Sequence, residues 1–254
     1  MPVAEKSAAL TLSKGLDILK YVQENPGRTI AKIASAMEIN RSTAHRLIKT
    51  LEGHYFIQQT LDGRGYEIGL GVLPPAAAQL DHNSVRIASI PYLNTLAQET
   101  GQRVNLGVLL GGDVLYLAGI EKPSLPNVYS RFGKVAPLHC CSLGKVILAM
   151  MDASEVESLL QNRTLERYTN NTLTDRDALL DDLAATRTRG FAVDNEEHID
   201  GTWCVSAPLM SPRSRPIGAI GISGSEKTTI IDSAEKVGSV AKIISHLLSP
   251  NVAL

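Results

Sequence analysis

The chain has 254 residues, which is long for a single hydrophobic core and sufficient for two domains. Its content of 44% hydrophobic and 20% charged residues is typical of soluble globular proteins, and no apolar stretch is long enough to span a bilayer. The N-terminal residues lack the apolar core of a secretion signal, and the odd set of cysteines, Cys140, Cys141 and Cys204, implies no disulfide framework. We therefore expect a cytoplasmic protein without a membrane partner.

The formal net charge of −1 hides an uneven distribution of charge. Residues 1–73 hold 9 Lys or Arg against 7 Asp or Glu, whereas residues 74–254 hold 16 against 19. Between positions 28 and 49, five basic residues accompany a single acid, Glu38. A local basic patch on an acidic protein is what contact with nucleic acid requires. An ordinary solvated helix face is the alternative, and charge alone does not exclude it.

Three helices and a hairpin are predicted over the first 70 residues. Apolar periodicity and turn residues place the helices at 13–24, 30–37 and 41–53, with Ser13, Thr29 and Asn40 as their N-caps. The following stretch alternates like two strands around Asp62–Gly65.

The second and third predicted helices match a helix-turn-helix. Ala34 can pack against Ala44 and Leu47, so that the opposite face of the third helix enters the major groove of DNA. The hairpin would act as a wing that touches the DNA backbone or minor groove through its tip. The predicted DNA-binding residues are Arg28, Arg41, Ser42, Thr43, His45, Arg46, Lys49 and Arg64. Among them, Arg46 can be bidentate to guanine or hold a phosphate, and Lys49 is expected to hold a phosphate.

Leu73-Pro74-Pro75 is predicted to end this unit, because two consecutive prolines break a helix and stiffen a linker. We expect domains at 1–73 and 84–254, joined by a linker at 74–83. The second domain mixes helices with hairpins, which indicates an α+β fold with a mostly antiparallel sheet. Its predicted helices are 84–100, 155–160, 175–189 and 233–248, and its strands lie within 103–121 (a hairpin around Gly111–Asp113), Asn127–Phe132, 190–197, 203–210 and 216–224.

The segment HCCSLGKVILA, residues 139–149, suggests a phosphate-binding loop at first. That motif needs glycine at position 139 and Ser or Thr at 146, where this chain has His139 and Val146. The apolar run instead predicts a helix that begins near Ser142–Gly144, with free N–H groups that could hold a carboxylate. A helix start that packs closely through Gly144 is the alternative.

Several of these stretches resemble one family. The segment TIAKIASAMEINRSTAHRLIKTLEGHYFIQ is similar to the N-terminal domain of the IclR family of bacterial transcriptional regulators, and STAHRL is very close to its recognition helix. The segments YSRFGKVAPLHCCSLGKVILA, YTNNTLTD, RGFAVDNEEHIDGTWCVSAPL and IGAIGISG resemble its effector-binding domain in the same order. Two departures are Glu38, where the family usually has glycine in the turn, and Pro74-Pro75, where its linker usually continues as a helix.

The resemblance implies a winged helix-turn-helix domain followed by a GAF/PAS-like α/β effector-binding domain. It further implies a dimer or tetramer on near-palindromic double-stranded operator DNA, and a repressor of a carbohydrate or organic-acid catabolic operon. No cofactor is expected, only a small carboxylate or sugar acid as effector. The effector-binding residues that the resemblance implies are Ser142, Leu143, Asp194, Cys204, Gly221 and Ser223.

Two other functions remain open. A metal- or redox-responsive regulator could use Cys140, Cys141 and Cys204 together with His139, Asp194 and His198, although their spacing matches no specific zinc pattern. Structural cysteines and histidines are the alternative, and no metal site is expected. An enzyme is not expected either, because no spacing supplies a nucleophile, a base and an oxyanion site together.

Overall fold

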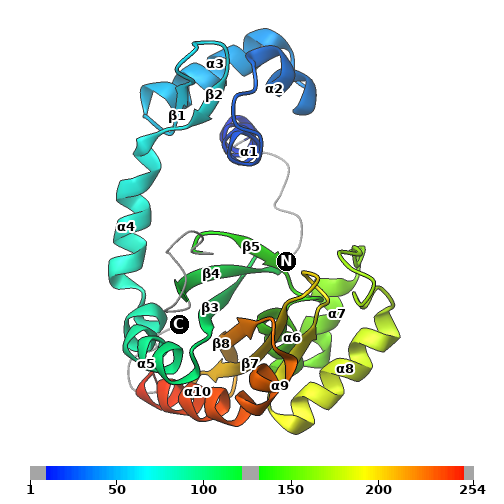
Figure 1. Cartoon of the computed structure of the whole chain (residues 1–254). Coiled ribbons are helices and arrows are strands. Elements are labelled where there is room, and N and C mark those ends of the chain that lie inside the picture. The colour runs from blue at the N-terminus through cyan, green and yellow to red at the C-terminus, as the bar shows by residue number, and fades with distance from the viewer. Residues whose placement is uncertain (1–9, 122–131, 249–254) are drawn as a thin grey trace. The chain divides into compact units, whose positions relative to one another are not determined.

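The computed structural model describes residues 10–121 and 132–248, and Figure 1 shows its helices and strands. The chain divides into two compact units, Met1–His82 and Asn83–Leu254. The second unit therefore begins at Asn83, the last residue of the linker predicted at 74–83.

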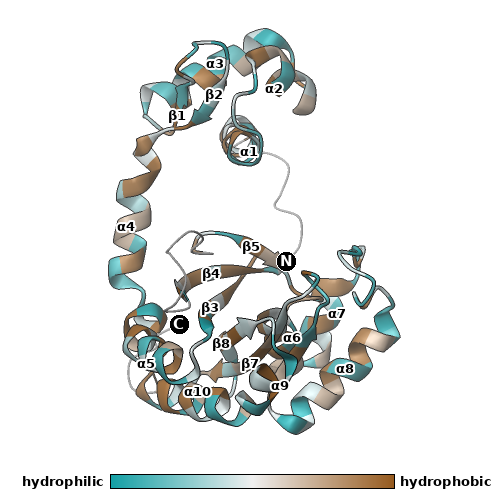
Figure 2. Ribbon diagram, viewed as in Figure 1, coloured by the Kyte–Doolittle hydropathy of each residue, from teal (hydrophilic) through white to brown (hydrophobic). Residues whose placement is uncertain are grey.

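The described part of the first unit begins with three helices and a hairpin, as predicted. Helices α1 (Leu10–Glu24), α2 (Ile30–Ala36) and α3 (Arg41–Gly53) precede the antiparallel strands β1 (Ile57–Gln59) and β2 (Tyr66–Ile68). Its core is a single apolar cluster, and the apolar stripes of the helices are visible in Figure 2. The fully or nearly fully buried members of this cluster are Ile18, Val22, Ile33, Leu47, Ile48, Ile57 and Tyr66.

Two of the three predicted N-caps are confirmed. The Thr29 hydroxyl accepts the N–H of Lys32, and the Asn40 carboxamide oxygen accepts that of Thr43 at 2.8 Å. The prediction for Ser13 was wrong, because α1 is already helical at Leu10 and no turn residue interrupts the chain between the two.

The prolines at 74 and 75 do not break a helix. A short 3-10 turn, Leu70–Val72, leads into α4 (Leu73–His82), and Pro74 and Pro75 lie in the first turn of α4. The prediction that they end helical structure was wrong, because N–H groups in a first turn have no intrahelical acceptor and proline loses nothing there.

The second unit is built on one antiparallel sheet of six strands, in the order β5-β4-β3-β8-β7-β6. The strands are β3 (Arg103–Leu110), β4 (Asp113–Ile120), β5 (Val135–Pro137), β6 (Ala192–Asn195), β7 (Trp203–Met210) and β8 (Pro216–Gly224). The α+β class is confirmed. The short β5 was not predicted, and most of the strand expected at Asn127–Phe132 lies outside the described residues.

Helices cover both faces of this sheet (Figure 1). They are α5 (Ser84–Thr100), α6 (Ser142–Met150), α7 (Ala153–Leu160), α8 (Arg176–Arg189), α9 (Lys227–Asp232, not predicted) and α10 (Ala234–Leu248). Helices α5 and α10 pack together against one face, whereas α6 packs against β7 and β8 from the other. Residues 142–149 of α6 are all buried, between the sheet and the layer of α7 and α8. In the described residues we find no helix with the length and apolarity to cross a bilayer.

Candidate functional site

Helix α3 presents one polar face to solvent and buries the other. Ala44, Leu47 and Ile48 lie in the core, whereas Arg41, Ser42, His45, Arg46 and Lys49 are exposed and Thr43 is half-buried. Asn40 orders the start of this face, because its side chain also accepts the Ser42 hydroxyl at 2.8 Å. The exposed face has the width and polarity of a helix that reads base edges in a major groove.

The turn before α3 holds a non-glycine residue in a left-handed conformation. Glu38 has a φ of 51°, the left-handed conformation in which the family usually places glycine. A side chain there costs about 1 kcal/mol. The Glu38 side chain is exposed.

The hairpin places its basic tip next to the loop before α2. Arg64 is exposed, and its N–H donates to the Asp62 carboxylate at 3.1 Å. A Cβ on Gly65 would lie 2.2 Å from the Gly27 carbonyl oxygen, so only glycine permits this close approach. The bridge between Arg28 and Tyr66 then fixes exposed Arg28 beside the hairpin. Seven of the eight predicted DNA-binding residues are thus exposed on the surface of this unit, and the eighth, Thr43, is half-buried.

Strand register aligns polar side chains across the sheet of the second unit. One row runs from Asp194 on β6 through Cys204 on β7 to Ser223 on β8. The next row pairs Ser206 with Gly221, and Gly221 with Asn105 on β3. Because side chains two residues apart share a face, both rows face the same side of the sheet as α6.

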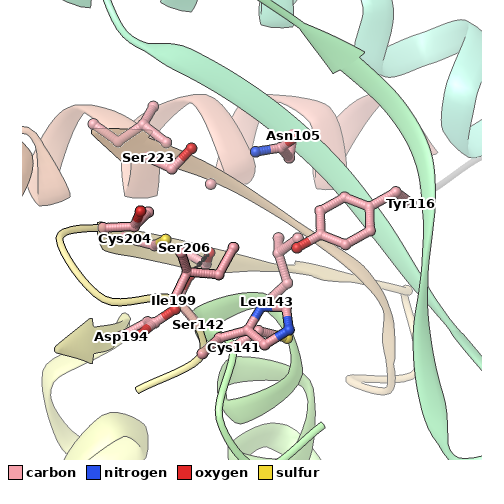
Figure 3. A pocket seen from close by; sticks show the side chains of 14 residues that line it. Asn105, Tyr116, Cys141, Ser142, Leu143, Asp194, Ile199, Cys204, Ser206 and Ser223 are labelled. Carbon is pink, nitrogen blue, oxygen red and sulfur yellow. Dashed lines mark hydrogen bonds between the residues drawn. The ribbon is translucent and has the colours of Figure 1, made fainter. Parts of the chain in front are cut away.

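A pocket lies between these rows and the start of α6 (Figure 3). It encloses about 360 Å³ of space between protein atoms, part of which is open solvent at its mouth. All six predicted effector-binding residues line it. The others are Asn105, Tyr116, Cys141, His198, Ile199, Thr202, Ser206 and Ile222, so no Lys or Arg is among the described residues that line it.

The start of α6 offers hydrogen-bond donors to this pocket. The Gly144 N–H donates to Cys141 Sγ at 3.4 Å and the Lys145 N–H to the Cys141 carbonyl, whereas the N–H groups of Ser142 and Leu143 have no acceptor within the described chain. The helix dipole also favours negative charge at this end. Gly144 serves close packing as well, because a Cβ there would lie 2.3 Å from the Leu138 carbonyl oxygen. The close packing through Gly144 is confirmed, whereas binding of a carboxylate by the free N–H groups stays a prediction.

Two buried polar groups in the pocket lack a partner. Asn105 Oδ1 and Ser223 Oγ make no hydrogen bond to any described residue, although these residues are only 6% and 7% exposed. Leaving such groups unpaired costs about 1–3 kcal/mol each. A bound polar molecule would remove that cost.

Among the described residues that line the pocket, Asp194 alone carries a carboxyl group. Its Oδ1 accepts the Glu197 N–H at 2.7 Å, and the Cys204 thiol also hydrogen-bonds to it. Burial raises the pKa of Asp194 to about 6, and these hydrogen bonds offset only part of the rise. The pKa of this carboxyl group therefore lies just below neutral pH.

Replacing Asp194 with Asn is expected to flatten the dependence of stability on pH. The folded wild type keeps the Asp194 proton up to about pH 6, whereas the unfolded chain loses it near pH 4, so the free energy of unfolding falls as pH rises between these values. The loss is on the order of 3 kcal/mol at neutral pH. Urea unfolding at pH 4.5 and 7.5 measures it, with exposed Asp181→Asn as the matched control. Equal pH slopes for wild type and Asp194→Asn would contradict this assignment.

A buried ion-pair network is connected to the pocket through Asp194. Lys145, which is 1% exposed, places its Nζ 2.5 Å from Glu197 Oε1 and 3.0 Å from Asp182 Oδ2 on α8. The Asp182 contact is an ion pair without hydrogen-bond geometry. Glu197 in turn donates its N–H to Asp194, so the network connects α6, α8 and the pocket carboxylate. Burial raises the pKa of Glu197, and the attraction of Lys145 lowers it only in part.

A loop over residues 196–202 closes the pocket with His198, Ile199 and Thr202. Trp203 lies outside the pocket lining and secures this loop, because its Nε1 donates to Glu196 Oε1 at 2.8 Å. Lys227 Nζ lies over the Trp203 ring, 4.4 Å from its centre.

The thiols and histidines do not converge on a metal site. Within residues 10–121 and 132–248, no three His, Cys, Asp or Glu side chains are grouped closely enough to hold a metal ion. Cys140 is fully buried, and burial raises the pKa of its thiol well above the ordinary range, which keeps it protonated and unreactive. The metal- or redox-responsive alternative thus finds no support in this part of the chain.

Comparison with known proteins covers both units. The IclR helix-turn-helix domain model matches residues 11–61, and the model of the C-terminal domain of bacterial transcriptional regulator IclR matches residues 77–246. The chain is 32% identical to the HTH-type transcriptional regulator XynR of Escherichia coli K12 over 226 residues, 89% of each chain. It is 30% identical to the HTH-type transcriptional repressor AllR of the same organism over 252 residues, 97% of this chain and 93% of that protein.

The chain belongs to the IclR family of bacterial transcriptional regulators. The crystal structure of the Thermotoga maritima IclR matches 95% of this chain and 99% of its own with a TM-score of 0.69 and 28% identity. An IclR-family regulator from Brucella abortus shares the fold at 20% identity, with a TM-score of 0.81 over 99% of this chain and 97% of its own. As a member of the IclR family, the protein is a transcriptional regulator with a DNA-binding and an effector-binding domain, and not an enzyme.

The IclR resemblance selected six residues that the structure places around one pocket, but it did not select the eight others, among them Asn105 and Ser206. Asn105 was not singled out because a lone asparagine in an apolar strand has no distinctive pattern. Ser206, whose Oγ lies 2.7 Å from Ser142 Oγ, could have been found from alternation along β7.

Proposed function

We propose that this protein represses a carbohydrate or organic-acid catabolic operon and is released from its operator by a small carboxylic or sugar acid bound in the second unit. The observation that carries the proposal is the pocket in which unpartnered Asn105 and Ser223 face the free N–H groups at the start of α6. The description of AllR as a repressor supports the sign of regulation.

The proposed DNA contact uses α3 and the hairpin. Ser42, Thr43 and His45 would reach base edges, Arg46 would bind guanine or phosphate, and the others would hold the backbone. Lys49 now pairs with Glu52 at 2.6 Å, and that hydrogen bond raises the pKa of Lys49. This exposed pair contributes little, so a phosphate can replace the Glu52 carboxylate.

The proposed operator is near-palindromic double-stranded DNA, and the proposed active form is a dimer or tetramer. Recognition helices of a dimer would enter major grooves about one turn, ~34 Å, apart. Exposed apolar side chains of the first unit support self-association, because a surface of this kind is costly in water. They are Leu10, Leu12 and Leu16 on α1, Leu70, and Leu73 at the start of α4. We place the protein in the cytoplasm with its DNA.

The proposed effector is an anion held without a basic side chain. Its carboxylate would accept from the N–H groups of Ser142 and Leu143, as anions do at helix starts. The IclR homologue from Microbacterium hydrocarbonoxydans, which shares the fold at 20% identity and a TM-score of 0.77, is complexed with 4-hydroxybenzoate, itself a carboxylic acid.

The proposal is tested in two steps. A thermal-shift screen of small acids at neutral pH identifies the effector, because a ligand at 100 times its Kd adds about 2.7 kcal/mol to the free energy of unfolding. Titration of DNA from beside the gene, with and without that acid, then tests release from the operator.

A further inference from the structure

The end of the pocket away from α6 is made by two adjacent strands. Asn105 on β3 pairs with Gly221 on β8, and Ser223 follows two residues later on the same face. Figure 3 shows Asn105 and Ser223 on one side of the pocket, and Cys141 and Ser142 on the other. A ligand held by its carboxylate at α6 would therefore extend toward Asn105 and Ser223.

Gly221 makes room for the Ser206 side chain between these two ends. A Cβ at this position would lie 2.0 Å from Ser206 Oγ and 2.7 Å from the Val205 carbonyl oxygen. Because glycine has no side chain at position 221, Ser206 packs close to β8 and hydrogen-bonds to Ser142. Asn105 lines the neighbouring part of the pocket. Ser206 and Ser142 hydrogen-bond to each other, so the side-chain oxygens that lack a partner are at the Asn105 end.

The unpaired atoms at that end are complementary to one chemical group. Asn105 Oδ1 can only accept a hydrogen bond, whereas the Ser223 hydroxyl can donate or accept. Asn105 and Ser223 are diagonal neighbours on the paired strands β3 and β8, at positions about 7–8 Å apart, and both line the pocket. A ligand hydroxyl placed there donates to Asn105 and accepts from Ser223. A carbonyl oxygen satisfies only Ser223, and a methylene group satisfies neither.

We infer that Asn105 is a specificity-determining residue that reads a hydroxyl group, and that the effector is a small hydroxy acid rather than a simple or an oxo acid. This inference rests on the proposed function, in which a carboxylate binds at α6. A site built to hydrogen-bond a hydroxyl rejects the analogue that lacks it, because its own buried groups then stay unpaired.

The test compares matched acids on the full-length protein by calorimetry: lactate, glycerate and 3-hydroxybutyrate against propionate, butyrate and pyruvate. The wild type is expected to bind at least one hydroxy acid about tenfold or more tightly than its deoxy and oxo partners. Asn105→Leu should bring that preference to within about twofold while retaining the affinity for the deoxy acid. Asn94→Leu, at an exposed site on α5, is the matched control and should keep the wild-type preference.

The outcomes distinguish failure of the inference about Asn105 from failure of the proposed function. Equal binding of hydroxy and deoxy acids by the wild type, or an unchanged preference in Asn105→Leu, overturns the inference and leaves the proposed function standing. Absence of binding by every acid removes the proposed function and the inference with it. Asn105→Ser, which is smaller and supplies a hydroxyl oxygen as a hydrogen-bond acceptor, is expected to keep part of the preference and provides the test if the Leu variant does not fold.

Discussion

Replacing Arg46 with Ala is expected to lower the affinity for operator DNA by about 10- to 100-fold for each half-site. Arg46 is exposed on the polar face of α3, one turn from Ser42 and Thr43, which are proposed to reach base edges. Its loss removes a bidentate contact to guanine or a charged contact to phosphate, while the buried face of α3 with Leu47 and Ile48 is untouched. Stability should therefore stay within about 0.5 kcal/mol of wild type.

Fluorescence anisotropy at fixed ionic strength measures this effect, because phosphate contacts make affinity depend on salt. Arg213→Ala is the charge-matched control, since Arg213 is exposed in the second unit and no DNA contact is proposed for it. It should leave specific binding unchanged. If Arg46→Ala binds the operator as tightly as Arg213→Ala, the assignment of α3 as the recognition helix is wrong.

Replacing Lys145 with Met is expected to lower the free energy of unfolding by about 3–5 kcal/mol at neutral pH. The substitution retains most of the buried volume but removes the cation that lies between Glu197 and Asp182. Two carboxylates then remain together with no buried positive charge between them. Lys145 lowers the pKa of Glu197, so the variant should hold the Glu197 proton to higher pH and lose less stability at pH 5 than at pH 8.

The double variant Lys145→Met with Glu197→Gln separates charge from packing. Neutralising Glu197 removes one uncompensated carboxylate and should restore part of the lost stability, as measured by urea unfolding. The Gln side chain still lies where Glu197 Oε1 accepts the Asn195 N–H, so the local loop can persist. A double variant less stable than Lys145→Met alone would show that the network acts through packing rather than charge.

Local chemistry made much of the first unit predictable. Thr29 and Asn40 are cap residues with free side-chain oxygens, and the structure uses both as caps. The two prolines of α4 show the limit of such rules, because the same residue breaks a helix or begins one according to its position. The sequence gives that position only when the helix start is already known.

The pocket was predictable in part. The apolar run after Ser142 located the start of α6, and the family resemblance supplied Asp194, Cys204 and Ser223. The partners of Lys145 could not be foreseen, because Asp182 and Glu197 are 37 and 52 residues away and meet it only through the packing of α8 and β6. The role of Asn105 depends likewise on strand register, which pairs it with Gly221 from the far end of the domain.

The central claim is that α3 holds operator DNA until a small acid occupies the pocket of the second unit. The most direct measurement is an anisotropy titration of labelled DNA from beside the gene, at one ionic strength, with and without the acid that stabilises the protein most in the thermal-shift screen. The account predicts specific binding with a Kd of about 10⁻⁸ M or lower, weakened at least tenfold by saturating acid. Failure to distinguish this DNA from random duplex, or binding that no acid alters, would contradict it.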